Sequence, residues 1–474
     1  MSVETILLIL SIGFGFYMAW SIGANDVANA MGTSVGSGAL TVKRAVIIAA
    51  VVEFAGAFFV GSNVSETIRQ GIISPEIFKG NPMDLVYGMA GALLAAAVWL
   101  QIASYFGWPV STTHSIVGSV LGFGVVVGGI HAADWSKVGS IVASWVISPV
   151  LSGTIAFIIF TFLRRMIYYN HDPVGAAKRA TPPIVFVVFL VLTLTMVFKG
   201  LKNLHLNLGF PQALVIAIII GLIAALISSV LVRRLKPINV EERILVKQPL
   251  SVVRGLPRVV QQVGKLSRSA KGDVKNQLDY IRGDLQTISD DIARGTEIEQ
   301  TSSEYKTVQG IFVYLQVLSA SFVAFAHGAN DVANAVGPLA AIISVLRTNV
   351  INMQSQVPLW ILGMGGVGIV IGLATWGWRV METIGKKITE LTPTRGFAAE
   401  FAAATTIIVA SKLGLPISTT HTLVGAVLGV GFARGIGALN MRTVLDIVIS
   451  WIITIPVGAG GAIIFYYILK SIFA

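Results

Sequence analysis

The 474-residue sequence has no cysteine and few charged residues, which make up 12% of the chain. The lack of cysteine excludes disulfide bridges, thiolate metal ligands and a cysteine nucleophile. Because soluble domains average about 25% charged residues, the low charge content also excludes an ordinary soluble protein. Hydrophobic residues make up 54% of the chain, and the composition therefore indicates an integral membrane protein.

The net charge of +11 does not imply a nucleic-acid partner, because the Lys and Arg residues collect in the connections between apolar runs. Basic connections lie on the cytoplasmic side of a membrane protein. This rule predicts a multi-pass protein of a cell membrane, with both termini outside and residues 235–306 forming a cytoplasmic loop.

Apolar runs of the ~17 to 25 residues that cross a bilayer as a helix recur from end to end. We predict about twelve such segments, at residues 5–22, 45–62, 84–106, 115–130, 138–163, 183–199, 211–232, 308–326, 357–378, 397–413, 420–435 and 444–470. Their continuity differs from the alternating pattern of an outer-membrane barrel. The expected fold is an all-α polytopic membrane protein with transmembrane or re-entrant segments. No Lys or Arg precedes the first run, so we expect it to be mature protein rather than a signal peptide.

Two motifs occur twice, in the same order and with nearly the same spacing. GANDVANA at residues 23–30 returns at 328–335, and PVSTTH at 109–114 returns as PISTTH at 416–421. About seven predicted segments, an odd number, separate the starts of the two copies, which predicts two inverted-topology repeats with broken helices or re-entrant hairpins at the substrate site. We expect a break in the first helix of each half, so that both motifs meet near the middle of the membrane.

The duplication divides the chain into three parts. Residues 1–234 form an N-terminal transmembrane half, with a repeat core at about 5–165 and extra helices at about 183–232, and residues 307–474 form the C-terminal half. The loop at 235–306 begins with basic residues, and its apolar residues from 274 to 292 are spaced as in an amphipathic helix or a short coiled coil. Such a helix lies on protein or lipid, or contacts a second subunit, so a homodimer is one expected assembly.

Each GANDVANA motif places a lone carboxylate in a long apolar stretch, which is costly and typical of an ion site. The carboxylate and its Asn neighbours share one face of a helical turn and offer the oxygen ligands that Na⁺ takes. The expected cation ligands are Asn25, Asp26, Asn29, Asn330, Asp331 and Asn334. The alternative is that these groups only join helices through hydrogen bonds.

Each Ser-Thr-Thr-His stretch follows a proline and precedes an apolar run, so it marks a helix N-terminus, where anions bind well. The expected ligands of a tetrahedral oxyanion are Ser111, Thr112, Thr113, Ser418, Thr419 and Thr420, with Asn29 and Asn334. The alternative role of the hydroxyls is helix capping. His114 and His421 either bind the anion or orient a neighbouring hydroxyl.

Charge links the two motifs, because two carboxylates beside HPO₄²⁻ hold about four negative charges and require cations. Binding of either ion then raises the affinity for the other. Further candidates for a cation or coupling role are Glu53, Glu400 and His327, besides the two motif histidines. No cofactor is indicated, and the coupling ion is Na⁺ or H⁺.

At these residues the chain resembles the inorganic phosphate transporter (PiT) family, which carries paired GANDVANA-type and P-[VI]-S-T-T-H signatures. The resemblance covers both halves and implies import of inorganic phosphate with Na⁺ or H⁺. It implies a site formed by Asp26, Asn29, Asp331, Asn334 and the Ser/Thr groups, and transport roles for Glu53, His327 and Glu400. The central loop is short compared with that of animal members, which favours a prokaryotic inner membrane.

Other functions fit the sequence less well. An H⁺-coupled metal-phosphate or sulfate permease shares the same motifs. A membrane hydrolase using Ser111, His114 and Asp26 lacks the G-x-S-x-G motif and leaves the duplication unexplained, and an anion channel leaves the two carboxylates unexplained. We therefore expect no enzyme but a symporter that imports phosphate by alternating access, with Na⁺ favoured.

Overall fold

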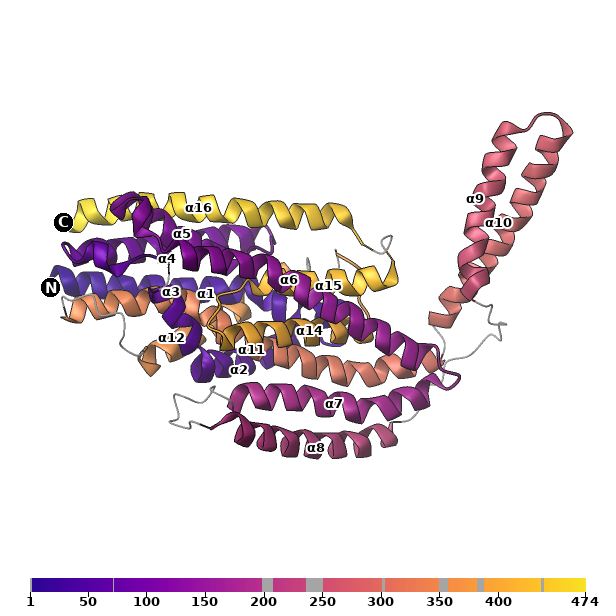
Figure 1. The fold of residues 1–474 in the computed structure, drawn as a ribbon, viewed down its shortest axis with the longest axis horizontal. Helices are drawn as coiled ribbons and strands as arrows, with labels where there is room; N and C mark the ends of the chain where they lie inside the picture. Colours follow the sequence, from indigo (N-terminus) through magenta and orange to yellow (C-terminus); the bar gives the residue numbers. More distant parts are fainter. Residues whose placement is uncertain are drawn as a thin grey trace.

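The computed structural model of the protein describes residues 2–70, 72–197, 208–235, 250–300, 303–348, 357–381, 388–435 and 439–474. This part of the chain is almost wholly helical (Figure 1). The helices are α1 (Val3–Gly36), α2 (Val42–Val60), α3 (Ser62–Gln70), α4 (Pro82–Tyr105), α5 (Thr112–Gly128), α6 (Trp135–Leu163), α7 (Pro173–Val197), α8 (Phe210–Arg234), α9 (Leu250–Ser269), α10 (Asp273–Gln300), α11 (Ser303–Thr348), α12 (Leu359–Thr375), α14 (Pro393–Lys412), α15 (Thr419–Arg434) and α16 (Met441–Phe473), with short turns η1 (Pro75–Phe78), η2 (Ile130–Ala132) and η3 (Arg164–Tyr168).

The predicted all-α membrane fold is confirmed. Within the described residues, 7 helices are long and apolar enough to cross a membrane: α1, α4, α6 with η3, α7, α8, α11 and α16. The apolar helices α5 and α12 are shorter. The end of the predicted segment at 183–199 and the basic residues at 236–249 of the central loop lie outside the described residues.

The break expected in the first helix of each half is wrong. α1 runs unbroken over 34 residues and α11 over 46 residues, which gives lengths of about 51 Å and about 69 Å at ~1.5 Å per residue. Both exceed the ~30 Å of a bilayer core, so each motif lies inside a long helix instead of after a span.

The motif glycines serve close packing rather than a break. A Cβ atom added to Gly23 would lie 2.0 Å from the carbonyl oxygen of Ile369 in α12, and one added to Gly328 would lie 2.1 Å from that of Glu53 in α2. Small residues permit this approach of helix backbones in membranes. The sequence prediction failed here because glycine has both uses and the spacing does not distinguish them.

Two helical hairpins take the place of the expected breaks. In the α4–α5 hairpin, the base is closed by a β-bridge between Ile73 and Ala133. Its tip lies about midway along α16, where Trp99 Nε1 donates to Thr454 Oγ1 at 3.1 Å and Gly118 packs on Ile455. The sequence left broken helices and re-entrant hairpins open, and the structure has hairpins.

The α14–α15 hairpin repeats this arrangement against α6. Its base is closed by Glu390, whose Oε2 lies 3.3 Å from Arg395 Nη1 and 3.0 Å from Arg434 Nη2. Near its tip, Trp145 Nε1 of α6 donates to the Pro416 carbonyl at 3.2 Å. Each hairpin therefore packs on the long helix that belongs to the other half of the sequence.

The two motif helices run in opposite directions. α1 begins at the labelled N-terminus, and α11 begins at the other end of the bundle, below the α9–α10 hairpin (Figure 1). Both chain termini lie at the end opposite that hairpin (Figure 1). Opposite directions are what inverted repeats require, and the inverted relation of the two halves stays a prediction.

Candidate ion-binding site

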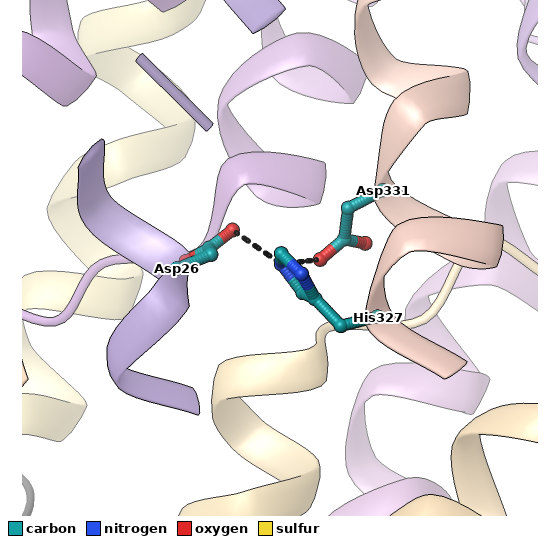
Figure 2. A group of neighbouring side chains, drawn as sticks. All are labelled: Asp26, His327 and Asp331. Atoms are coloured by element: carbon teal, nitrogen blue, oxygen red, sulfur yellow. Dashed lines mark ion pairs between the residues drawn. The ribbon is translucent and has the colours of Figure 1, made fainter. Parts of the chain in front are cut away.

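The two motif carboxylates meet across a histidine. Figure 2 shows Asp26 from α1 facing His327 and Asp331 from α11. His327 Nε2 lies 3.0 Å from Asp331 Oδ2 and 3.8 Å from Asp26 Oδ2. The side chains of all three residues are fully buried, and their ligand atoms lie within 4.8 Å of one another. Helices far apart in the sequence thus build one compact acidic centre.

Threonines from the start of α15 bind both carboxylates. Thr419 Oγ1 donates to Asp331 Oδ2 at 2.7 Å, and Thr420 Oγ1 lies 3.4 Å from Asp26 Oδ1. Thr420 also donates to the Val110 carbonyl at 3.1 Å. The N-terminus of α15 is therefore attached to the motif helices of both halves.

A matching hydrogen bond joins the tips of the two hairpins in the opposite direction, from α5 to the segment before α15. Thr113 Oγ1 of α5 donates to the Ile417 carbonyl at 3.0 Å. The carbonyl that accepts from Thr420, at Val110, occupies the matching position of the first motif copy. The two hairpin tips therefore bind each other reciprocally beside the carboxylates.

The amides of Asn29 and Asn334 donate to these threonines. Asn29 Nδ2 lies 2.8 Å from Thr420 Oγ1 and 3.0 Å from Asp26 Oδ1. Asn334 Nδ2 lies 3.3 Å from Thr112 Oγ1 and 3.3 Å from Thr113 Oγ1. Each Asn thus links its own motif helix to the hairpin of the other half.

The amides of Asn25 and Asn330 are held by matching serines. Asn25 Nδ2 donates to Ser104 Oγ at 3.0 Å, and Asn330 Nδ2 donates to Ser411 Oγ at 2.9 Å. Sequence reasoning missed both serines, although they occupy corresponding positions in the two copies and lie shortly before the proline of each second motif. That correspondence was the available signal.

Five buried oxygens of the motifs have no hydrogen-bond partner among the described residues. They are Asn25 Oδ1, Asp26 Oδ2, Asn29 Oδ1, Asn330 Oδ1 and Asp331 Oδ1. A buried acceptor without a partner costs about 1–3 kcal/mol. Carboxylate and amide oxygens are ligands that hard cations prefer, so this set of oxygens fits Na⁺.

The motif serines cap the hairpin helices. α5 begins at Thr112 and α15 at Thr419, directly after Ser111 and Ser418. Ser111 Oγ accepts from the backbone N–H of His114 at 3.1 Å, and Ser418 Oγ accepts from that of His421 at 3.2 Å. The unpaired N–H groups and the positive ends of the helix dipoles favour an anion here.

The motif histidines pack against each other and against tryptophans. The ring centroids of His114 and His421 are 4.3 Å apart. The centroid of His114 lies 3.8 Å from that of Trp145, and the centroid of His421 lies 3.5 Å from that of Trp451. These rings therefore join the two hairpins to α6 and α16 in an aromatic stack.

Glu53 belongs to the carboxylate centre. Its Oε2 lies 3.3 Å from His327 Nδ1, on the side of the imidazole away from Asp331. Both side chains are fully buried. The structure thus combines two residues that the sequence suggested only separately.

Glu400 of α14 lies in a second polar cluster. The residues of α1 in this cluster come about two helical turns after Asp26. Its Oε1 accepts from Thr33 and Ser34 at 2.6 Å each and from Gln316 at 3.1 Å. Its Oε2 accepts from Ser319 Oγ at 2.5 Å. The sequence indicated Glu400 but not its partners, because isolated Ser, Thr and Gln residues are common in membrane helices.

Comparison with known proteins gives one consistent result. The family model described as "Phosphate transporter family" matches residues 22–462. The chain is 47% identical over 463 residues to "Inorganic phosphate transporter 2-1, chloroplastic" of Arabidopsis thaliana, a match that covers 97% of this chain and 71% of the relative. It is similar to a solved structure titled "The sodium-dependent phosphate transporter", with 38% identity and a TM-score of 0.80, over 98% of this chain and 100% of that one.

Proposed function

Because the chain belongs to the phosphate transporter family, we propose that it imports inorganic phosphate by symport with cations, Na⁺ being favoured. It is a multi-pass membrane protein and not an enzyme. The observation that carries the proposal is the pair of buried carboxylates, each with an oxygen that no described residue hydrogen-bonds, set beside two helix N-termini. Cation ligands and anion ligands thus share one occluded centre.

Charge explains why the two substrates travel together. Asp26, Asp331 and HPO₄²⁻ would place about four negative charges in one buried centre, and unit charges 4 Å apart interact by about 4 kcal/mol even at an effective dielectric of 20. His327 supplies at most one positive charge. Bound cations offset the remainder, so each substrate raises the affinity for the other.

We assign the roles as follows. The cations bind Asp26 and Asp331 together with the side-chain oxygens of Asn25, Asn29, Asn330 and Asn334. The phosphate binds Thr112, Thr113, Thr419 and Thr420 and the adjacent helix starts, with the amides of Asn29 and Asn334. Ser111 and Ser418 contribute by capping those helices, and the stack of His114 and His421 holds the hairpins together.

Na⁺ is the favoured coupling ion because five oxygen acceptors have no donor within the part of the chain that the structure describes. H⁺ is the alternative, since His327 lies between Asp331 and Glu53 and could carry a proton there. Under either ion Glu53 positions His327, while Glu400 offers a further cation or coupling group. A proton-coupled metal-phosphate or sulfate permease would use the same framework.

The hydrolase alternative has no support in the contacts. Ser111 Oγ accepts from a backbone N–H, and the ring of His114 packs on Trp145. A nucleophilic serine needs a base within hydrogen-bond reach of its hydroxyl. The Ser111 and His114 side chains are used for capping and stacking instead.

We propose that the protein lies in the inner membrane of a prokaryotic cell, with both termini outside and the α9–α10 hairpin in the cytoplasm. The basic connections support this orientation. Alternating access would expose the centre to each side in turn.

Labelled phosphate uptake into proteoliposomes tests the function. We expect uptake to follow an imposed inward Na⁺ gradient and to be weak with an H⁺ gradient alone. An excess of unlabelled phosphate should compete, and sulfate and arsenate would define selectivity. Uptake that ignores both gradients would contradict symport, and uptake driven only by H⁺ would replace Na⁺ as the coupling ion.

A further inference from the structure

The base of the α14–α15 hairpin brings two arginines to one carboxylate. Glu390 Oε2 lies 3.3 Å from Arg395 Nη1, in the first turn of α14, and 3.0 Å from Arg434 Nη2, at the end of α15. The side chains of the two arginines are only 10% and 21% exposed. Two guanidinium groups therefore converge on a single oxygen atom of one negatively charged group.

The two arginines are also held by the backbone. Arg395 Nη1 donates to the Glu390 carbonyl oxygen at 3.1 Å, and Arg434 Nη1 donates to the same oxygen at 3.2 Å. Arg434 Nη1 also lies 3.4 Å from Thr389 Oγ1. None of these contacts involves the carboxylate. The guanidinium groups therefore keep partners that hold them in place when the carboxylate turns away.

The Glu390 carboxylate is the exchangeable partner of the two arginines. Its side chain is 68% exposed, and an ion pair that is open to water adds little stability. Guanidinium groups bind phosphate oxygens with the same planar geometry as carboxylate oxygens. A phosphate monoester or HPO₄²⁻ carries more negative charge and more acceptor oxygens than a carboxylate. Such a group can therefore take the place of the carboxylate between the arginines.

A third arginine adds to the positive charge at the hairpin base. Arg164, directly after α6, donates through Nη1 to the carbonyl oxygen of Ala433, the residue before Arg434. Its buried Nε has no hydrogen-bond partner among the described residues. In the ion pairs of the described residues, Glu390 is the only carboxylate that contacts any of these three arginines. The hairpin base therefore has an excess of positive charge.

We propose that Arg395 and Arg434 form a second oxyanion site, in which a phosphate group displaces the Glu390 carboxylate. The ligand is free inorganic phosphate or the phosphate monoester headgroup of a lipid, which present the same oxygens. Arg434 lies at the opposite end of α15 from Thr419, about 22 Å along the helix. Because this site uses neither Asp26 nor Na⁺, the proposal is independent of the proposed transport function.

Binding of labelled inorganic phosphate in Na⁺-free buffer tests the site. The purified protein carries Asp26→Asn, to disable the carboxylate centre, and lies in nanodiscs of zwitterionic lipid. Arg434→Gln should weaken binding about tenfold, because it removes charge-assisted donors. Glu390→Gln should strengthen binding about tenfold, because it removes the competing carboxylate. The control Arg442→Gln changes an exposed arginine and should leave the affinity unchanged.

The opposite signs of the two changes separate a binding site from a clasp that only holds the hairpin. Arg434→Lys keeps the charge and should weaken binding less than Arg434→Gln. Thermal unfolding in the same nanodiscs identifies any variant that is not folded. The proposal would be overturned by equal affinities in Arg434→Gln and its parent, or by no saturable binding in both the parent and Glu390→Gln.

Two further measurements identify the ligand and separate this site from transport. Phosphatidic acid added to the nanodiscs should compete with labelled phosphate if a lipid headgroup is the ligand, and should leave binding unchanged if free phosphate is. Na⁺-driven uptake is measured on protein without the Asp26 substitution. Uptake without Na⁺-free binding would refute the second site alone, whereas Na⁺-free binding without uptake would support it and refute the proposed transport.

Discussion

The two halves of the chain share their central chemistry but differ immediately around it. Asn25 and Asn330 each donate to a matching serine, and Gly23 and Gly328 each pack on the backbone of a neighbouring helix. The position before the motif, however, is Ile22 in one half and His327 in the other. The shared residues are those that we propose to bind the two substrates, whereas His327 contacts the carboxylates of Asp26, Asp331 and Glu53.

The difference extends to the packing partners of the two glycines. Gly23 packs on Ile369, and its counterpart Gly328 packs on Glu53. His327 and Glu53 thus form a polar pair at the Gly328 contact, whereas Ile22 and Ile369 occupy the matching places at the Gly23 contact. The duplication of the site therefore does not extend to this pair.

The largest effect should come from removing either shared carboxylate. Asp26→Asn and Asp331→Asn each delete one charge from a cation site, which at an effective dielectric of 20 amounts to about 4 kcal/mol, or roughly 1000-fold in uptake. Na⁺-driven uptake in proteoliposomes measures this. The control Asp446→Asn changes an exposed carboxylate and should retain wild-type uptake. If one of the two motif variants still takes up phosphate, the two motif carboxylates are not equivalent.

The next effect concerns the pair of His327 and Glu53, which has no polar counterpart at the Gly23 contact. His327→Ile removes the ion pair of Glu53, whose carboxylate has no hydrogen bond to any other described residue, and this should lower the free energy of unfolding by about 3 kcal/mol. Adding Glu53→Ile copies the apolar arrangement of Ile22 and Ile369 at the Gly23 contact and should recover at least half of that loss. Thermal unfolding in detergent measures both, and additive losses would show that the two residues are not coupled.

A smaller effect should follow from the threonines that join the hairpin tips. Thr113→Val and Thr420→Val each remove one buried hydroxyl that donates to the opposite tip, a loss of about 1.4 kcal/mol, or roughly tenfold in the KM for phosphate. Thr113→Ser and Thr420→Ser should stay near wild type. If one valine variant keeps the wild-type KM for phosphate, the two hairpin tips do not contribute equally to phosphate binding.

The smallest effect is expected at the helix caps. Ser111→Ala and Ser418→Ala each remove a cap on a hairpin helix, which should cost about 1 kcal/mol of stability. Thermal unfolding of the two purified variants should show matching shifts. A loss of uptake much larger than this stability change would mean that the serine hydroxyls bind phosphate directly.

The motifs and helices were predictable because their signals are local. Apolar run length located the apolar helices, of which 7 within the described residues are long enough to cross a membrane. Identical residues repeated with their neighbours, such as Asp26 and Asp331, predicted a joint site. The contact between His327 and Glu53 was not predictable, since it depends on how α11 packs on α2. Sequence spacing describes one helix face and does not say which helix covers it.

The path of the chain near the site could also not be predicted from the sequence. A glycine such as Gly23 suits both a helix break and a close helix contact, and only the position of Ile369 decides between them. Likewise Gln316 and Ser319 can be recognised as hydrogen-bond donors to a buried carboxylate only because Glu400 lies opposite them. Tertiary packing supplied these partners.

The exchange of hairpins between the halves bears on how the chain folds. α15 packs along α6, and α5 packs along α16, so neither half completes its own packing. A chain holding only residues 307–474 would leave α15 without its support, but two single-copy chains inserted in opposite directions would supply it to each other. Each half of the chain therefore depends on the other to support its hairpin, so neither half is expected to fold as a separate unit.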